Sequence, residues 1–141
     1  MGPLCGPIGA GAIMSKLSKV LLTIVGVLNL FFGFFHIYLG YAIHQNVAIA
    51  APLKGLMESL NAGGGLMIFF LSYASLLHQK DMMTTELGRA VLALGALLFL
   101  SRAAEEFVWF TFRPPIFYSC LAVGLLYAIL LLRAQARSQT A

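Results

Sequence analysis

The side chains with the greatest chemical potential in this sequence are charged groups set inside an apolar segment. Arg102 is followed three and four residues later by Glu105 and Glu106, directly after the apolar run 91–100. Ionisable groups at membrane depth cost roughly 2.5–3.5 kcal/mol each on insertion scales, so by default they mark a functional site. The same spacing also fits an ion pair within one helix, which would stabilise that helix and do nothing else.

The composition around these charges is that of a membrane protein. Of 141 residues, 60% are hydrophobic and 10% are charged, whereas soluble domains carry about 25% charged residues. The net charge of +4 comes from basic residues at the ends of the apolar segments rather than from one patch. We therefore expect no nucleic-acid partner, and one domain that lies mostly within the lipid bilayer.

Four apolar segments predict an all-α membrane protein, a four-helix transmembrane bundle with up-down-up-down connections. The predicted helices cover residues 17–43, 56–77, 85–110 and 114–132. At about 1.5 Å per residue, helices of this length cross roughly 30 Å of hydrocarbon. The transmembrane domain in this interpretation is 16–133, preceded by a flexible tail at 1–15 and followed by a basic cytoplasmic tail at 134–141.

The lysines and arginines predict how this bundle is oriented. Six lie on the side that holds both termini and the middle connection: Lys16, Lys19, Lys80, Arg89, Arg133 and Arg137. Lys54 and Arg113 lie on the other side. Because cytoplasmic loops carry an excess of basic residues, both termini are expected in the cytoplasm. The expected location is the inner (cytoplasmic) membrane of a bacterium.

Small residues predict which face of the first helix points inward. At alternating spacings of three and four residues, one stripe holds Gly26, Asn29, Gly33, His36 and Gly40. Small residues at such spacing let another membrane helix approach closely. In the second helix, the glycine run 63–65 is interpreted in the same way, as a place of close backbone contact.

Counting residues from the helix ends places polar side chains of all four helices at a similar depth. His36 lies 17 residues beyond Lys19, and Arg102 lies 17 beyond Thr85, so each is roughly 25 Å from the inner side. The second and fourth helices descend from the outer side with polar residues in their first turns. We expect a pocket in the outer third of the bundle, lined by His36, Glu58, Asn61, Arg102, Glu105, Glu106 and Tyr118. Asn29 is the main polar residue outside it.

The spacing of possible ligands argues against a resident metal or haem. His36 and His44 lie on one helix about 12 Å apart, so they cannot both ligate one haem iron. A dimetal site of the ferritin type needs Glu-x-x-His on two helices, and the sequence has no such pair. Arg102 would compete with a metal ion for the nearby carboxylates. We predict no metal site, and the sequence identifies neither a cofactor nor a catalytic residue.

Two functions of different classes fit these observations. The first is a helical subunit or scaffold of a membrane complex, with a partner protein or a second copy of the chain, because the protein is small and its loops are short. The alternative is a membrane-embedded enzyme or binding protein for a lipid-soluble molecule such as a quinone, sterol or lipid. Arg102 would then bind an oxygen, His36 or a glutamate would move a proton, and Tyr118 would donate a hydrogen bond. A transporter is disfavoured because the inner two-thirds of the bundle is nearly free of polar side chains.

Overall fold

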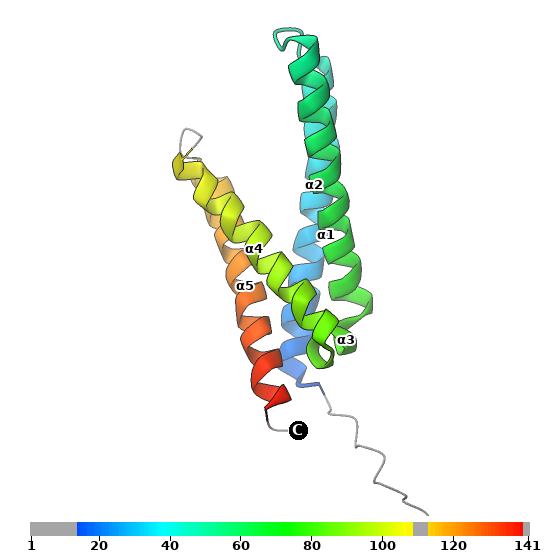
Figure 1. Cartoon of the computed structure of the whole chain (residues 1–141), viewed down its shortest axis with the longest axis vertical. Helices are drawn as coiled ribbons and strands as arrows, with labels where there is room; N and C mark the ends of the chain where they lie inside the picture. Colours follow the sequence, from blue (N-terminus) through cyan, green and yellow to red (C-terminus); the bar gives the residue numbers. More distant parts are fainter. Residues whose placement is uncertain (1–13, 109–112, 140–141) are drawn as a thin grey trace, which may run out of the picture.

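The computed structural model describes residues 14–108 and 113–139, and each regular element in this part of the chain is an α-helix (Figure 1). The helices are α1 (Lys16–Gln45), α2 (Ala51–Leu77), α3 (Gln79–Thr84), α4 (Glu86–Val108) and α5 (Pro114–Ser138). All except α3 are long and apolar enough to cross a membrane. The predicted all-α class is therefore confirmed, with four helices that have the length and composition to span a membrane.

The helix ends follow local chemistry and differ in places from the predicted bounds. Ser15 caps α1, because its side-chain oxygen accepts a hydrogen bond from the N–H of Ser18 at 3.2 Å. α2 begins at Ala51, earlier than predicted, with Pro52 in its first turn, where a missing N–H does no harm. The connection after α2 contains the short α3, and α5 continues to Ser138 into the predicted tail. The predictions for 1–13, 109–112 and 140–141 lie outside the described residues.

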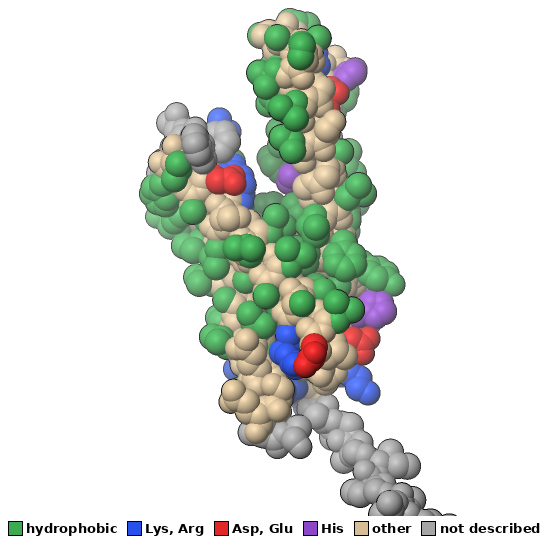
Figure 2. Space-filling view, in the orientation of Figure 1, with side chains coloured by type: hydrophobic (Ala, Val, Ile, Leu, Met, Phe, Trp, Pro, Cys, Tyr) green, Lys and Arg blue, Asp and Glu red, His purple; other side chains and the backbone are tan. Residues whose placement is uncertain are grey.

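The four long helices are arranged as two hairpins that diverge like the arms of a V (Figure 1). α1 packs along α2, and α4 packs along α5. The start of α1, the end of α5 and the short α3 lie together at the closed end. The space-filling view shows an open cleft between the far halves of the two arms, and hydrophobic side chains over much of both (Figure 2). The bundle is thus closed at one end and open at the other.

The closed end is held by side chains from both hairpins. Leu22 of α1, Leu71 of α2, Leu92 of α4 and Leu130 of α5 are each 0% exposed. Lipid tails are as apolar as leucine, so in a bilayer such contacts stabilise the fold through close packing rather than through removal of water.

Glycines at the seams of the hairpins make that packing close. A Cβ added to Gly26 would lie 2.6 Å from the side chain of Leu76, and one on Gly33 would lie 2.7 Å from the ring of Phe69. Gly95 of α4 faces an aromatic ring of α5 in the same way. The glycines of the predicted inward stripe of α1 therefore face α2.

Candidate functional site

The seven residues predicted to share one pocket lie on two different hairpins. His36 is on α1, and Glu58 and Asn61 are on α2; the remaining four, Arg102, Glu105, Glu106 and Tyr118, are on α4 and α5. The hydrogen bonds of the first group join α1 to α2, whereas the ion pairs of the second group lie within α4. The structure therefore forms two polar clusters, one on each hairpin.

In the first cluster, His36 and Asn61 bind each other's backbone. The side-chain nitrogen of Asn61 donates to the backbone oxygen of His36 at 2.8 Å. His36 Nδ1 lies 3.3 Å from the backbone oxygen of Asn61. A carbonyl oxygen can only accept, so these partners define both the direction of the amide and the position of the imidazole proton on Nδ1. The pair locks α1 against α2.

Glycines provide the space for this pair. A Cβ on Gly65 would lie 3.2 Å from the Cβ of His36, and one on Gly64 would lie 3.3 Å from its ring. On the opposite helix, a Cβ on Gly40 would lie 3.0 Å from the amide nitrogen of Asn61. By contrast, a Cβ on Gly63 would meet nothing within 4 Å. Two of the three consecutive glycines thus have a specific purpose, which is to admit the imidazole.

A groove of about 670 Å³ opens beside the pair, and its described lining residues all belong to α1 and α2. It extends along the seam from Gly33 and Phe69 to His44 and Glu58. Sites for small molecules are usually clefts of about 300–1,000 Å³ with apolar walls and a few convergent polar groups. The size and the lining of this groove fit that description.

Glu58 occupies the outer end of the groove, with His44 as its partner. His44 Nδ1 and Glu58 Oε1 are 3.1 Å apart, and the two side chains are 71% and 36% exposed. Lys54 donates to the backbone oxygen of His44 at 2.9 Å. An ion pair exposed to this degree contributes about 0–1 kcal/mol to stability, so its main effect is to place a carboxylate at the mouth of the groove.

In the second cluster, Glu106 connects the end of α4 to the start of α5. Its side chain is buried, forms a close ion pair with Arg102, and accepts a hydrogen bond from the backbone N–H of Arg113 at 3.3 Å. Glu105 lies 3.8 Å from Arg102 with 45% of its side chain exposed. Tyr118 is 62% exposed. These contacts favour a structural role for Glu106, in agreement with the alternative of an ion pair within one helix.

A third polar group joins the two hairpins, and among its members only Asn29 was named from the sequence. Asn29 of α1 donates to the hydroxyl of Tyr127 of α5, and Ser75 of α2 lies 3.2 Å from the same hydroxyl. All three side chains are 0% exposed, and the ring of Tyr127 stacks on Phe99. Tyr127 lies in the middle of an apolar segment, away from the interfacial aromatic belts. Because a buried hydroxyl needs a hydrogen-bond partner, this tyrosine is the sequence signal that could have identified the group.

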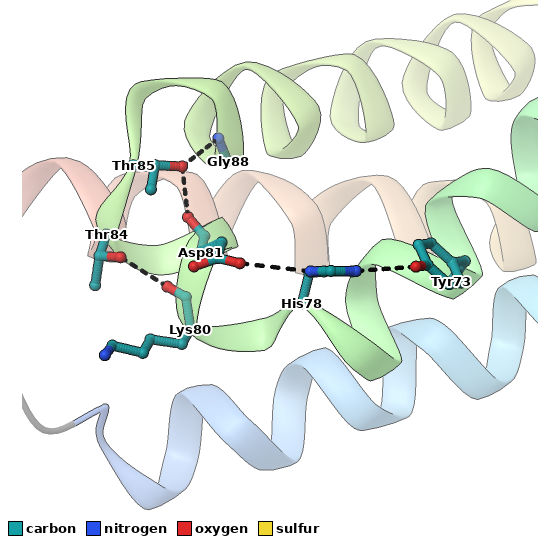
Figure 3. Close-up of polar contacts among 7 residues, drawn as sticks. All are labelled: Tyr73, His78, Lys80, Asp81, Thr84, Thr85 and Gly88. Carbon is teal, nitrogen blue, oxygen red and sulfur yellow. Dashed lines mark hydrogen bonds and ion pairs between the residues drawn. The ribbon is translucent and has the colours of Figure 1, made fainter.

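A fourth cluster lies at the closed end, in the turn from α2 to α4 (Figure 3). His78 is placed between Asp81 Oδ2, 3.4 Å from its Nδ1, and the Tyr73 hydroxyl, 3.1 Å from its Nε2. Thr85 accepts a hydrogen bond from the N–H of Gly88 at 2.9 Å and so caps the start of α4. His78 and Asp81 are 48% and 64% exposed, which suits a turn at the membrane surface.

The described residues contain no group of three or more His, Cys, Asp or Glu side chains arranged to hold a metal ion. No protein-family model, no curated protein and no solved structure matches the chain. The groove and the polar clusters are therefore the features of the molecule that bear on its function.

Proposed function

We propose that the chain is an integral membrane protein that binds a lipid-soluble small molecule in the groove between α1 and α2. The observation that carries this proposal is the groove itself, about 670 Å³ in volume, with His36 and Asn61 in its otherwise largely apolar wall. Ligand sites combine an apolar cavity with a few positioned polar groups in this way. Arg102 and Glu106 are not part of the site, because they pair with each other on α4.

The depth of the groove suits an amphiphilic ligand. His36 lies 20 residues beyond Lys16, the first residue of α1, which is about 30 Å along the helix axis. The hydrocarbon layer is also about 30 Å thick, so His36 is placed near its outer boundary. From Gly33 to His44 the groove spans 11 residues, or about 16 Å. About 5 Å of this length lies on the hydrocarbon side of His36 and about 12 Å on its outer side, so the groove lies at the boundary, where the polar head of an amphiphilic molecule is found.

A matched pair of tryptophan substitutions tests the proposal. Ala62 lines the groove, whereas Leu60, two residues away on α2, is 68% exposed and is not among the lining residues. Each protein is extracted in mild detergent, and co-purified small molecules are measured by mass spectrometry. We expect the wild type and Leu60→Trp to carry the same molecule and Ala62→Trp to carry at least ten-fold less. Equal amounts in all three would contradict the proposal.

The open cleft between the hairpins favours a second candidate, a helical subunit or scaffold of a membrane complex. The hairpins meet at the closed end and leave their facing surfaces separated farther out (Figure 2), where a transmembrane helix of a partner or of a second copy would pack. Extraction of the native membrane into polymer-bounded discs, followed by mass measurement, tests this candidate. A discrete assembly of constant stoichiometry is expected, and a lone chain would contradict it.

The proposal also places the closed end on the cytoplasmic side of a bacterial inner membrane, with up-down-up-down helices and both termini in the cytoplasm. The distribution of basic residues supports it. Near the closed end lie Lys16, Lys19, Lys80, Arg89, Arg133 and Arg137. Lys54 and Arg113 lie at the starts of α2 and α5, the far ends of the hairpins. An excess of basic residues of this kind is typical of the cytoplasmic side.

A further inference from the structure

The partners of His36 define where its ring is able to bind a further group. Nδ1 faces the backbone oxygen of Asn61 at 3.3 Å, and that oxygen can only accept a hydrogen bond. In the neutral ring the proton is therefore on Nδ1, and Nε2 carries a lone pair. Among the described residues, nothing donates a hydrogen bond to Nε2. The free position of His36 is thus an acceptor.

Asn61 has a second acceptor that no described donor uses. Its amide nitrogen is used to bind the backbone of His36, so its Oδ1 points the other way. That oxygen is buried and has no hydrogen-bond partner in the part of the chain that the structure describes. Burying an unpaired acceptor is unfavourable. The groups of His36 and Asn61 that remain unused are therefore both acceptors; Tyr41, five residues farther along α1, is the lining residue whose hydroxyl can donate.

The charges along the groove also favour a neutral ligand that donates a hydrogen bond. Glu58 places a carboxylate at the outer end, and the described lining residues include no lysine or arginine. An anionic head, such as a fatty-acid carboxylate or a lipid phosphate, would meet this carboxylate, and the lysine at the mouth, Lys54, donates to the backbone oxygen of His44. A neutral head that donates a hydrogen bond has no such penalty.

From these three observations we infer the chemical class of the ligand: a lipid-soluble alcohol or phenol whose hydroxyl donates a hydrogen bond to His36 Nε2. Its apolar body lies along the groove beside Gly33, Leu66 and Phe69. This inference rests on the proposed function and narrows it. Ketones, oxidised quinones and ethers bring only acceptors and cannot make this hydrogen bond to His36 Nε2.

Three probes with one common chain separate donor from acceptor: farnesol, its methyl ether and the aldehyde farnesal. Binding to the protein in nanodiscs of a neutral phospholipid is measured by equilibrium dialysis, with Ala62→Trp nanodiscs as the background for partition into lipid. We expect farnesol to bind about ten-fold more tightly than the ether or the aldehyde, which is the effect of one hydrogen bond that only the alcohol makes.

The variant His36→Phe keeps a ring against Gly64 and Gly65 but removes the acceptor. We expect the three probes to bind it with equal affinity, at the level of the ether on the wild type. Imidazole ¹⁵N NMR of the wild type provides a second readout that does not depend on the variant. The signal of His36 Nε2 should be that of a nitrogen without a proton, and should move with farnesol but not with the ether.

The possible outcomes separate the two claims. If no probe binds above the Ala62→Trp background, the proposed function fails and the ligand class fails with it. If the three probes bind equally to the wild type, the groove binds lipid-soluble molecules but the hydroxyl preference is wrong. A proton found on Nε2 of His36 would also overturn the inference, because the free position of the ring would then be a donor.

Discussion

At the scale of single residues, the charged side chains of Arg102 and Glu106, set within an apolar segment, stabilise the connection between α4 and α5. Glu106 is 1% exposed, forms an ion pair with Arg102 and accepts a hydrogen bond from the backbone N–H of Arg113. A carboxylate in such a place is stable only while its partners remain, since an uncompensated buried charge is costly. The cluster of Arg102, Glu105 and Glu106, which first suggested chemistry, is better understood as a structural contact between the end of α4 and the start of α5.

Replacement of Arg102 by alanine tests this interpretation. Removing one partner of a buried pair costs about 3–5 kcal/mol, and because 35% of the Arg102 side chain is exposed, we expect a smaller loss of about 2 kcal/mol. Thermal denaturation followed by size-exclusion chromatography measures the change. Glu105→Ala is the control, with an expected change within about 0.5 kcal/mol. An Arg102→Ala protein of normal stability that had lost its ligand would contradict us and restore the predicted single pocket.

At the scale of elements, the seam between α1 and α2 determines the shape of the groove. The helices approach closely because glycine occupies positions where a Cβ would collide with Phe69, as at Gly33, or crowd His36, as at Gly65. The imidazole is held in turn by its hydrogen bond to the backbone of Asn61. The spacing of the helices and the direction of the His36 ring are therefore coupled.

The glycine run of α2 offers a matched test of this coupling. In Gly65→Ala, the new methyl group would lie 3.2 Å from the Cβ of His36, which cannot move without moving α1, whereas in Gly63→Ala it meets open space. We expect Gly65→Ala to lose about 1 kcal/mol of stability, as for other overpacked positions, and to bind the co-purified ligand more weakly. Gly63→Ala should be neutral or slightly stabilising. Equal behaviour in denaturation and ligand retention would show that the seam is not tightly packed.

At the scale of the whole molecule, the two hairpins are joined by a small polar centre near the middle of α1 and α5. Asn29 and Ser75 of one hairpin share the hydroxyl of Tyr127 of the other, and Phe99 covers its ring. Where lipid surrounds the helices, interhelical hydrogen bonds and close packing replace the hydrophobic effect as the source of association. The arms beyond this centre are free to diverge, and they do (Figure 1).

The proposed orientation of the whole molecule is tested by labelling single cysteines in intact cells. Native Cys5 and Cys120 are replaced by serine, and one cysteine is introduced at Ala48, in the connection from α1 to α2, or at Ser138, the last residue of α5. A maleimide that does not cross membranes should label Ala48→Cys directly and Ser138→Cys only after the cells are permeabilised. The reverse pattern would place the closed end outside.

The sequence by itself determined the class of the protein and much of its local structure. In lipid a backbone must satisfy its own hydrogen bonds, so four long apolar segments become four helices whatever their neighbours. The stripe of glycines on α1 also indicated correctly that this face packs against another helix, because close approach requires small residues at helical spacing.

Only the tertiary structure decided which polar residues meet. Counting residues along a helix gives depth in the membrane, which is one coordinate; the lateral distance between helices depends on how they pair and at what angle they cross. His36 and Arg102 were predicted to lie at similar depths, but they belong to different hairpins. Because the hairpins diverge, similar depth does not bring the two side chains into one pocket. Asn29 and Tyr127, 98 residues apart, meet instead at the point where the arms join.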